Sequence, residues 1–399
     1  MQFDRSAANI PSSQDTHRRV AWITPEFPPD RGGVSDHSAA MVNALRAAGH
    51  DLLVCSGSQQ RGFSRLDAEL ASFGPDLVIV AYTPLGYAPR TVGISPALVL
   101  WSIRLRSRLG CQAILLAHET SLALEYLLQN RELKLAAVAT AQMAQFTALA
   151  LSFDSVLFSN LGAQRAWARL LSPIASRFRS IRICSNIPYQ PSEDPAAELT
   201  NAGYSVPSST ILFFGTGHEA VLFDYLEAAF LALLQVESNA GLVIVGMNSA
   251  RLREVRPTLA NLGDRVKALG YVGAPQVSLW LQVAKLVLAP LIGGISARKG
   301  TVMAALQHGR PVVTTRGSNT LDDIPWDEIC IFAPPGREGF AAKAALALRD
   351  AQSCSSIGLA ARAEYEANAS ASITAARILR YASESSTRAH AATTTNKRR

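Results

Sequence analysis

The architecture of this chain can be read from one stretch near its start, VAWITPEFPPDRGGVSDHSAAMVNALRAAGHDLLVCS, residues 20–56. Two short apolar runs, 20–24 and 51–56, flank a helix-like segment, 38–49, that ends at Gly49. Runs without a polar face are typical of parallel strands buried on both sides, and a glycine commonly ends a helix. The stretch therefore predicts a strand–helix–strand unit of a doubly wound α/β sheet.

The same pattern recurs in two series along the 399 residues. Further strands are expected at 76–82, 113–118, 155–159, 181–188, 210–215, 241–246, 266–272, 286–290, 311–315 and 330–334, and further helices at 296–309 and 340–350. We expect two doubly wound, Rossmann-like domains that face a central cleft, with ligands outside the carboxyl ends of the strands. The expected organisation is a disordered leader (1–17), an N-terminal domain (18–188), a Pro-containing linker (189–209), a C-terminal domain (210–370), a C-terminal helix that packs back on the N-terminal domain (371–383) and a disordered tail (384–399).

Composition narrows the class of protein. Hydrophobic residues make up 48% and charged residues 17%, which excludes a disordered or fibrous chain. The net charge of +7 suits phosphate-bearing ligands or an anionic membrane surface and is weak for a nucleic-acid binder. Five scattered cysteines without a Cys-x-x-Cys pair favour a reducing cytoplasm over a disulfide framework or a zinc site. The sequence contains no uninterrupted run of 18 apolar residues, so we expect no membrane-spanning helix. The first residues are not typical of a secretory signal.

Glycines mark the first candidate site. Gly32 and Gly33 lie between the strand at 20–24 and the following helix, where backbone N–H groups can approach an anion or a sugar hydroxyl. An ordinary strand–helix turn would also explain this pair.

Several motifs, in this order and spacing, resemble family-4 (group 1) glycosyltransferases. They are TPEFPPDRGGVSDHSAAMVNALRAAGH (24–50), a Tyr-x-Pro loop followed by a His-Glu pair (81–119), SNIP (185–188), FGTGHEAVLFDYLEAAFLAL (214–233) and GGISARKGTVMAALQHGRPVVTT (293–315). The resemblance covers about residues 18–380. It implies the two-domain GT-B fold, a nucleoside diphosphate sugar as donor in the C-terminal domain, an acceptor in the N-terminal domain and transfer with retention of configuration. It implies no cofactor, and the absence of an Asp-x-Asp motif agrees with a site that needs no bridging metal.

The resemblance also assigns residues in the N-terminal domain. His118 ends a predicted strand, where an imidazole can bind a sugar hydroxyl or stabilise developing charge, and we expect it to be catalytic together with Glu119. A buried structural histidine is the alternative. Tyr82 and Tyr87, in and after the Tyr-x-Pro loop, are expected to bind the acceptor, and Gly32 and Gly33 to contribute to donor binding.

The donor segment departs from the family pattern. The two glutamates expected with seven residues between them would fall at Ser296 and Ala304, and the Arg and Lys expected after the first strand of the domain are absent. Arg298 and Lys299 stand instead at the start of the following helix. We therefore expect a subgroup with a Ser-x-Arg-Lys-Gly donor motif.

Cations and free helix N–H groups stabilise a departing diphosphate. We hypothesise that Arg298 and Lys299 replace the missing pair, although a solvated first helical turn would give the same pattern. The donor-binding residues expected in this domain are Gly215, Thr216, Gly217, His218, Ser296, Arg298, Lys299, Gly300 and Thr301.

Basic residues are concentrated in the N-terminal domain. Residues 90–182 contain eleven Lys or Arg and four Asp or Glu, a difference of +7. In 98–110 and 165–179, Trp101 and Trp167 lie among these arginines. Such helices suit an anionic bilayer, so that a cytoplasmic protein peripheral to the inner face of the membrane is one expectation. Ordinary solvated helices are the other.

The function expected is transfer of a sugar from a nucleoside diphosphate sugar to a saccharide or lipid-linked acceptor, in polysaccharide or glycolipid biosynthesis. A degenerate, non-catalytic GT-B protein that acts as a binding module is the alternative, because the two glutamates are missing. A sugar-nucleotide epimerase or an NAD enzyme ranks below both, since no Gly-x-Gly-x-x-Gly follows the first strand.

Overall fold

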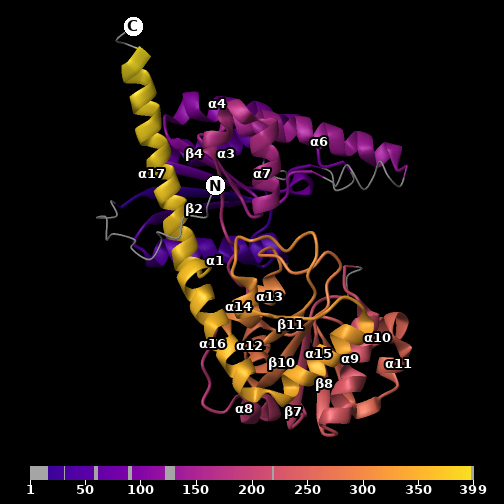
Figure 1. Ribbon diagram of the computed structural model, residues 1–399. Coiled ribbons are helices and arrows are strands. Elements are labelled where there is room, and N and C mark those ends of the chain that lie inside the picture. Colours follow the sequence, from indigo (N-terminus) through magenta and orange to yellow (C-terminus); the bar gives the residue numbers. More distant parts are fainter. Residues whose placement is uncertain are drawn as a thin grey trace. The chain divides into compact units, whose positions relative to one another are not determined.

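The computed structural model describes residues 17–30, 32–57, 62–88, 92–121, 131–217 and 220–396. The chain divides into two units, each with its own sheet (Figure 1). The N-terminal unit comprises the residues up to 184 together with those from 371 onward, and the C-terminal unit comprises 185–370.

The sheet of the N-terminal unit has six parallel strands in the order β2-β1-β3-β4-β5-β6. Its strands are β1 (Arg19–Thr24), β2 (Asp51–Ser56), β3 (Leu77–Tyr82), β4 (Gln112–Ala117), β5 (Ser155–Phe158) and β6 (Phe178–Ser180). Val20 and Trp22 of β1 pack into one hydrophobic cluster and Ala21 and Ile23 into another. Burial on both faces explains why the strand sequence does not alternate with polar residues.

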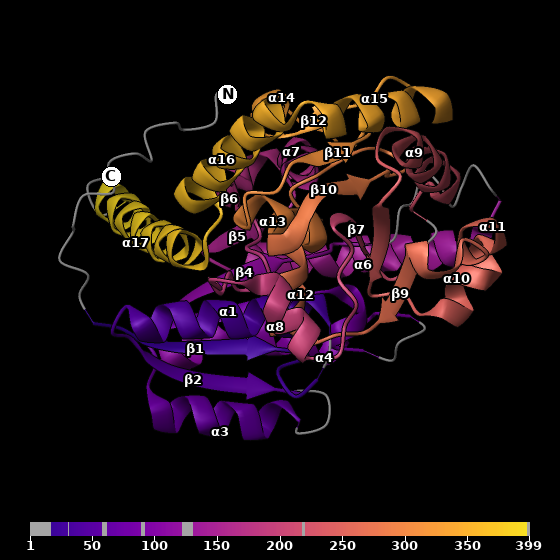
Figure 2. The same ribbon diagram turned by 90° about the horizontal axis from the view of Figure 1, so that it is seen from below.

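Helices cover both faces of this sheet. They are α1 (Gly33–Ala47), α3 (Phe63–Phe73), α4 (Pro96–Leu109), α6 (Leu133–Ser152), α7 (Leu161–Leu170) and α17 (Ala371–Asn396), with short 3-10 turns η2 (Pro84–Gly86) and η3 (Ser172–Arg177). Figure 2 shows α1 and α3 on opposite sides of β1 and β2. Residues of α1 and α17 belong to one core cluster, and residues of α3, α4, α6 and α7 to the other.

The C-terminal unit repeats this plan with the parallel order β12-β11-β10-β7-β8-β9. Its strands are β7 (Ser209–Phe214), β8 (Ala240–Val245), β9 (Val266–Gly270), β10 (Ala284–Ala289), β11 (Val312–Thr314) and β12 (Ile331–Phe332). Its helices are α8 (Pro195–Asn201), α9 (Phe223–Val236), α10 (Ser249–Val255), α11 (Pro257–Ala260), η4 (Gly263–Arg265), α12 (Ala274–Val283), α13 (Gly300–Gln307), α14 (Trp326–Ile329), α15 (Arg337–Arg349) and α16 (Ala351–Asn368). The prediction of two doubly wound α/β domains is confirmed.

Three local expectations differ from the structure. No strand covers 181–188, because the sixth strand is β6, where Phe178 is buried and pairs with Val156. The expected linker, 189–209, contains α8, whose Leu199 lies in the core of the C-terminal unit. The expected tail, 384–399, is helical to residue 396 as part of α17. Residues 1–16 of the expected leader lie outside the described residues.

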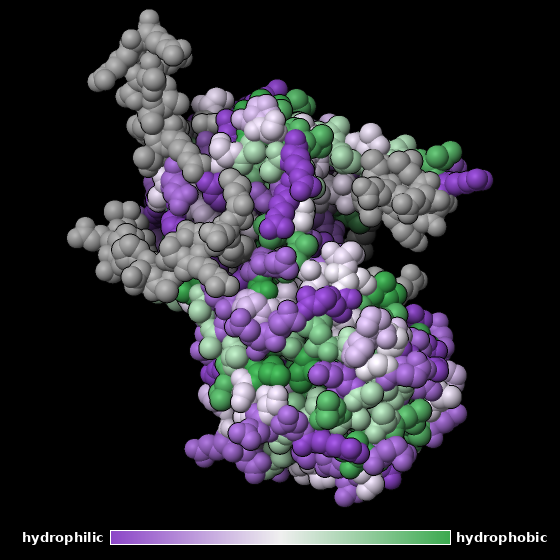
Figure 3. Space-filling view, in the orientation of Figure 1, coloured by the Kyte–Doolittle hydropathy of each residue, from purple (hydrophilic) through white to green (hydrophobic). Residues whose placement is uncertain are grey.

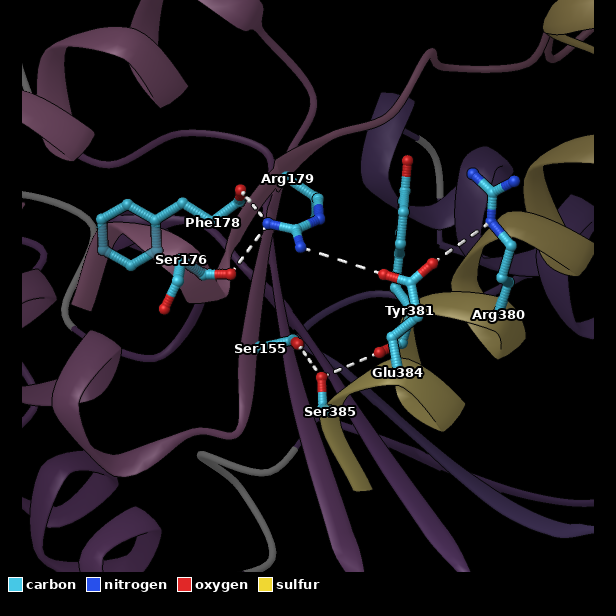
Figure 4. A network of polar contacts seen from close by, with 8 residues as sticks. All are labelled: Ser155, Ser176, Phe178, Arg179, Arg380, Tyr381, Glu384 and Ser385. Atoms are coloured by element: carbon cyan, nitrogen blue, oxygen red, sulfur yellow. Dashed lines mark hydrogen bonds and ion pairs between the residues drawn. The ribbon is translucent and has the colours of Figure 1, made fainter. Parts of the chain in front are cut away.

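Helix α17 joins the N-terminal unit through its apolar face. Ala375, Ile378, Leu379 and Ala382 are buried in the cluster that includes α1. Polar contacts add to this at the level of β5 and β6 (Figure 4). The guanidinium of Arg179 donates to the carbonyl oxygens of Ser176 and Phe178 at 2.8 and 3.0 Å and lies 3.8 Å from the carboxylate of Glu384, which is also paired with Arg380.

Helix α6 is long and apolar enough to cross a membrane by length and composition alone, which differs from the expectation of no spanning helix. Part of this helix packs in the core: Phe146, Leu149 and Ala150 are fully buried in the cluster with α3, α4 and α7. We therefore interpret α6 as a core helix of the N-terminal unit.

Candidate functional site

The carboxyl edge of the C-terminal sheet brings two loops together. The loop after β7 and the loop after β10 are joined by backbone hydrogen bonds from Leu222 N to the Pro290 oxygen at 3.0 Å and from Ile292 N to the Ala220 oxygen at 2.9 Å. Val221 and Leu291 also form an antiparallel bridge. The glycine motifs on either side of this bridge, at 215–217 and 293–294, therefore belong to one edge, as expected of a ligand site in a parallel sheet.

The first motif, Gly215-Thr216-Gly217, lies where backbone segments approach closely. Gly217 has φ +79°, and a Cβ atom there would lie 2.8 Å from the sulfur of Met247. The backbone of Gly215 in turn leaves no room for a side chain at Gly246, whose Cβ would lie 2.9 Å from the Gly215 oxygen. His218, the fourth residue expected here, lies outside the described residues.

The second motif, Gly293-Gly294, packs against the loop after β11. Both residues have positive φ, +75° and +82°. A Cβ on Gly294 would lie 2.3 Å from the backbone nitrogen of Gly317, and the amide of Ile295 donates to the Thr315 oxygen at 3.2 Å. The motif thus needs glycine both for its conformation and for the space, and it fixes the path of the chain toward α13.

The Arg-Lys pair stands at the start of α13. Lys299 is the N-cap residue and its amide closes a turn onto the Ser296 oxygen at 3.1 Å. Gly300 and Thr301 form the first turn, where N–H groups lack intrahelical acceptors. The predicted residues Ser296, Lys299, Gly300 and Thr301 are half-buried, whereas Arg298 is exposed.

The electrostatics of this turn favour an anion. Partial burial, and then the neighbouring guanidinium of Arg298, lower the pKa of Lys299 from its usual value. No carboxylate in the described part of the chain forms an ion pair with Lys299. Two adjacent cations at a helix N-terminus form an arrangement that a phosphate group would stabilise.

Two further residues near these motifs were not predicted. The carboxamide oxygen of Asn186, in the SNIP segment, lies 3.5 Å from where a Cβ on Gly300 would stand. Arg251, on α10, has its Cγ 3.5 Å from the corresponding position on Gly217 and pairs with Glu254. The position of Arg251 in the first turn of the helix that follows β8, the strand next to β7, was the available signal in the sequence.

The positions of the two missing glutamates differ in their surroundings. Ser296 is half-buried beside the helix start, so its side chain lies in the candidate site. Ala304 is fully buried in the core formed with α12 and α16. No side chain of the second position is therefore available to a nucleotide.

In the N-terminal unit, His118 follows β4. Its backbone amide donates to the Tyr82 oxygen at 2.9 Å, and its carbonyl accepts from the Ser159 hydroxyl at 3.1 Å. The side chain is 9% exposed, and its ring contacts the ring of His37 edge to face, with centroids 5.0 Å apart. Glu119, the next residue, is exposed.

The two glycines after β1 lie at the same edge of this sheet. Gly32 is the N-cap of α1 with φ +159°, and a Cβ there would lie 2.9 Å from a carboxylate oxygen of Glu26. Gly33 is the first residue of α1 and has open space around it. These glycines and His118 belong to the N-terminal unit, whereas the other expected donor-binding residues belong to the C-terminal unit.

The expected acceptor residues Tyr82 and Tyr87 lie in the core. They are 0% and 2% exposed. The Tyr87 hydroxyl donates to the Ala81 oxygen at 2.9 Å, and the Tyr82 hydroxyl accepts from the Gln145 amide at 2.9 Å. Burial raises the pKa of Tyr82 to about 12. We therefore reassign both tyrosines to packing, since neither offers surface to an acceptor.

Within the described residues, no group of three or more His, Cys, Asp or Glu side chains is placed to hold a metal ion.

Solved structures with this fold are glycosyltransferases and related enzymes. A sucrose-phosphate synthase from Thermosynechococcus elongatus matches with a TM-score of 0.66 and 17% identity over 91% of this chain and 98% of that chain. Anabaena HepE in complex with UDP matches with a TM-score of 0.61 and 16% identity over 92% of this chain and 100% of that chain. WaaG, a glycosyltransferase involved in lipopolysaccharide biosynthesis, matches with a TM-score of 0.63 and 14% identity over 90% of this chain and 98% of that chain. The fold of this chain is accordingly that of the GT-B glycosyltransferases.

Part of the C-terminal unit also matches a family by sequence. Residues 208–350 match the family model described as glycosyl transferases group 1, a range that includes the glycine motifs and α13. Over this range the C-terminal unit is therefore similar to the glycosyltransferases of group 1. A comparison with curated proteins finds no match.

Proposed function

We propose that this protein transfers a sugar from a nucleoside diphosphate sugar to a saccharide or lipid-linked acceptor with retention of configuration. The observation that carries the proposal is the half-buried Lys299, which has no carboxylate partner among the described residues and stands beside Arg298 at the start of α13. The diphosphate would supply the missing negative charge. Anabaena HepE, which has this fold, binds UDP and UDP-glucose, in agreement with a donor of this class.

The reaction proposed breaks the bond between the anomeric carbon and the diphosphate and forms a bond to an acceptor oxygen on the same face, with the proton of the acceptor hydroxyl passing to the departing diphosphate. Negative charge increases on the diphosphate as this bond breaks, and Arg298, Lys299 and the first N–H groups of α13 would stabilise it. His118, which would hydrogen-bond the donor sugar, and Glu119 are the proposed catalytic residues, and Gly32 and Gly33 would contribute to donor binding. Catalysis would then depend on positioning and on charge stabilisation.

Nucleotide binding is the direct test. UDP, GDP, ADP and dTDP sugars are first screened for thermal stabilisation, since a ligand of the folded state raises Tm. The diphosphate of the best donor is then titrated by calorimetry into the protein and into the double variant Arg298→Ala/Lys299→Ala. We expect the variant to bind about 100-fold more weakly, because two charge-assisted hydrogen bonds are lost.

A matched control removes two cations elsewhere in the same unit. Arg265 and Lys267, at the amino end of β9, donate to the carbonyl oxygens of Ser238 and Ser205. Their replacement by alanine should leave nucleotide affinity unchanged. Equal affinity of the Arg298→Ala/Lys299→Ala variant and the original protein would contradict the assignment. Failure of the original protein to bind any of the four nucleotides would favour the non-catalytic alternative, which rests on the missing glutamates.

We further propose that the protein acts in polysaccharide or glycolipid assembly as a cytoplasmic protein at an anionic membrane surface. On α4, Leu100 and Ile103 are 54% and 58% exposed and lie next to the exposed side chains of Arg104 and Arg108. Leu151 of α6 lines the same surface groove as Ile103. In the region where Figure 1 draws α4 and α6, Figure 3 shows hydrophobic and strongly hydrophilic residues side by side.

The sequence-based argument for this surface has changed in one respect. Trp101 and Trp167 do not face solvent: both are in the core of the N-terminal unit, and the Trp101 indole donates to Asp67 at 2.7 Å. The exposed apolar side chains that lie among the arginines of α4 are instead Leu100 and Ile103.

A further inference from the structure

His37 is a buried histidine whose polar atoms have no use in the fold. It lies in the first turns of α1 and is 3% exposed. Neither ring nitrogen has a hydrogen-bond partner among the described residues. Burying such groups without a partner destabilises the folded state, and a phenylalanine would fill the same space without that cost.

Other buried histidines of the chain do have partners. Nδ1 of His50 accepts from the Arg18 amide at 3.3 Å, and both nitrogens of His308 are within 2.8 Å of a partner. Each of these two rings has at least one bonded nitrogen, whereas neither nitrogen of His37 has a hydrogen-bond partner among the described residues.

The neighbour of His37 is His118. The two ring centroids are 5.0 Å apart with an interplanar angle of 80°. Both backbones are held in place. The Ser38 hydroxyl, next to His37, lies 3.0 Å from that of Thr24 at the end of β1, and the amide and carbonyl of His118 are bound as described above. The rings thus meet at the carboxyl edge of the sheet, with little freedom for either backbone to move.

Burial lowers the pKa of His37 to about 4. At neutral pH the ring is therefore uncharged, with one N–H donor and one acceptor nitrogen. It can provide either half of a hydrogen bond to a second imidazole without placing two positive charges side by side.

We infer that His37 is a positioning residue for His118: its ring fixes the plane of the His118 imidazole, and its nitrogen hydrogen-bonds that imidazole when a substrate hydroxyl is bound. This inference rests on the proposed function, in which His118 binds the donor sugar. It explains why a polar ring occupies a place where the free protein has no hydrogen bond for it.

The test compares His37→Phe with the original protein. Phenylalanine keeps a ring against His118 and removes only the nitrogens. We expect Tm to rise by about 2–4 °C, because an unsatisfied polar group is removed. We expect kcat for the best donor of the nucleotide screen to fall about tenfold, the effect of one lost hydrogen bond. Affinity for the nucleoside diphosphate, held by the other unit, should not change. His37→Gln, which keeps a donor and an acceptor, should retain more of kcat than His37→Phe.

His50→Phe is the matched control. It replaces a buried histidine that does have a partner and should lower Tm while leaving kcat unchanged. Undiminished kcat in His37→Phe, or a loss of Tm in that variant, would overturn the inference. A loss of nucleoside diphosphate affinity would do the same, since the effect would then not be local to His118. If the original protein neither bound a nucleotide nor turned over a donor, the proposed function itself would fail, and that outcome is separate from any effect of the variants.

Discussion

At the scale of single residues, burial decides which polar side chains are available for chemistry. Lys299 is half-buried beside another cation, an arrangement that costs free energy until an anion arrives. His308, by contrast, has both ring nitrogens engaged: Nδ1 lies 2.8 Å from the Ala304 oxygen and Nε2 lies 2.8 Å from the Ser278 hydroxyl. The first residue is suited to a ligand and the second to the stability of the C-terminal unit.

Because His308 is buried, we expect protonation of its ring to lower the stability of the folded protein in acid. Burial lowers its pKa to about 4, against 6.5 for a free histidine, so the neutral ring favours the folded state. Its contribution is fully present above about pH 6.5 and is lost as the pH falls toward 4. Urea unfolding at about pH 7 and about pH 4 should show that the original protein loses up to about 3 kcal/mol more than His308→Gln. An equal loss in the two proteins would mean that the ring is not held neutral.

The sequence predicted where several candidate residues lie in the fold but not how exposed they are. Arg298 and Lys299 could be placed at a helix start because Gly293-Gly294 and the apolar residues after Gly300 are local signals. Tyr82 and Tyr87 were expected to bind the acceptor, but both are buried, and nothing local in the sequence shows that Gln145 hydrogen-bonds the Tyr82 hydroxyl. The unpartnered state of His37 is also a property of the packed structure alone.

At the scale of elements, the glycine loops set the position of α13. Gly294 and Gly263 both have positive φ, +82° and +59°, but only Gly294 lacks space for a side chain. The loops after β10 and β11 therefore depend on each other, through Gly294 and Gly317, in a way that neither motif reveals by itself.

Alanine substitutions at these two glycines should separate strain from contact. Gly263→Ala should lower the free energy of unfolding by about 1 kcal/mol, because alanine is strained in the left-handed conformation. Gly294→Ala should cost about 3 kcal/mol or more and weaken nucleotide binding, because the new Cβ would also collide with Gly317 and shift the start of α13. Denaturant unfolding and calorimetry measure both effects. Similar values for the two variants would show that the loops are not packed as described.

Most strands could be predicted because burial on both faces leaves short, continuous apolar runs in the sequence. The exception was β6, where Arg177 and Arg179 flank Phe178 and hide the strand. The extent of α17 was also missed, since its polar sequence after residue 383 resembles a tail. Its anchoring residues, Ile378 and Leu379, lie earlier and pack on the other end of the chain.

At the scale of the whole molecule, the exposed apolar groups of the N-terminal unit predict binding to anionic vesicles. We expect more sedimentation with vesicles of phosphatidylcholine and phosphatidylglycerol than with phosphatidylcholine alone, and a decrease with salt. Leu100→Ser/Ile103→Ser should weaken binding at least about tenfold. Leu346→Ser/Leu359→Ser, which changes leucines that are 58% and 70% exposed in the C-terminal unit, is the control and should have no effect. Equal sedimentation with both kinds of vesicle would contradict the membrane proposal.

The central claim concerns the place of the diphosphate, and a crystal structure of the protein with a bound nucleoside diphosphate tests it most directly. We predict phosphate oxygens within hydrogen-bonding distance of Arg298 or Lys299 and of the amides of Gly300 and Thr301, beside the loop that contains Gly215 and Gly217. A diphosphate bound away from the start of α13 would contradict the account.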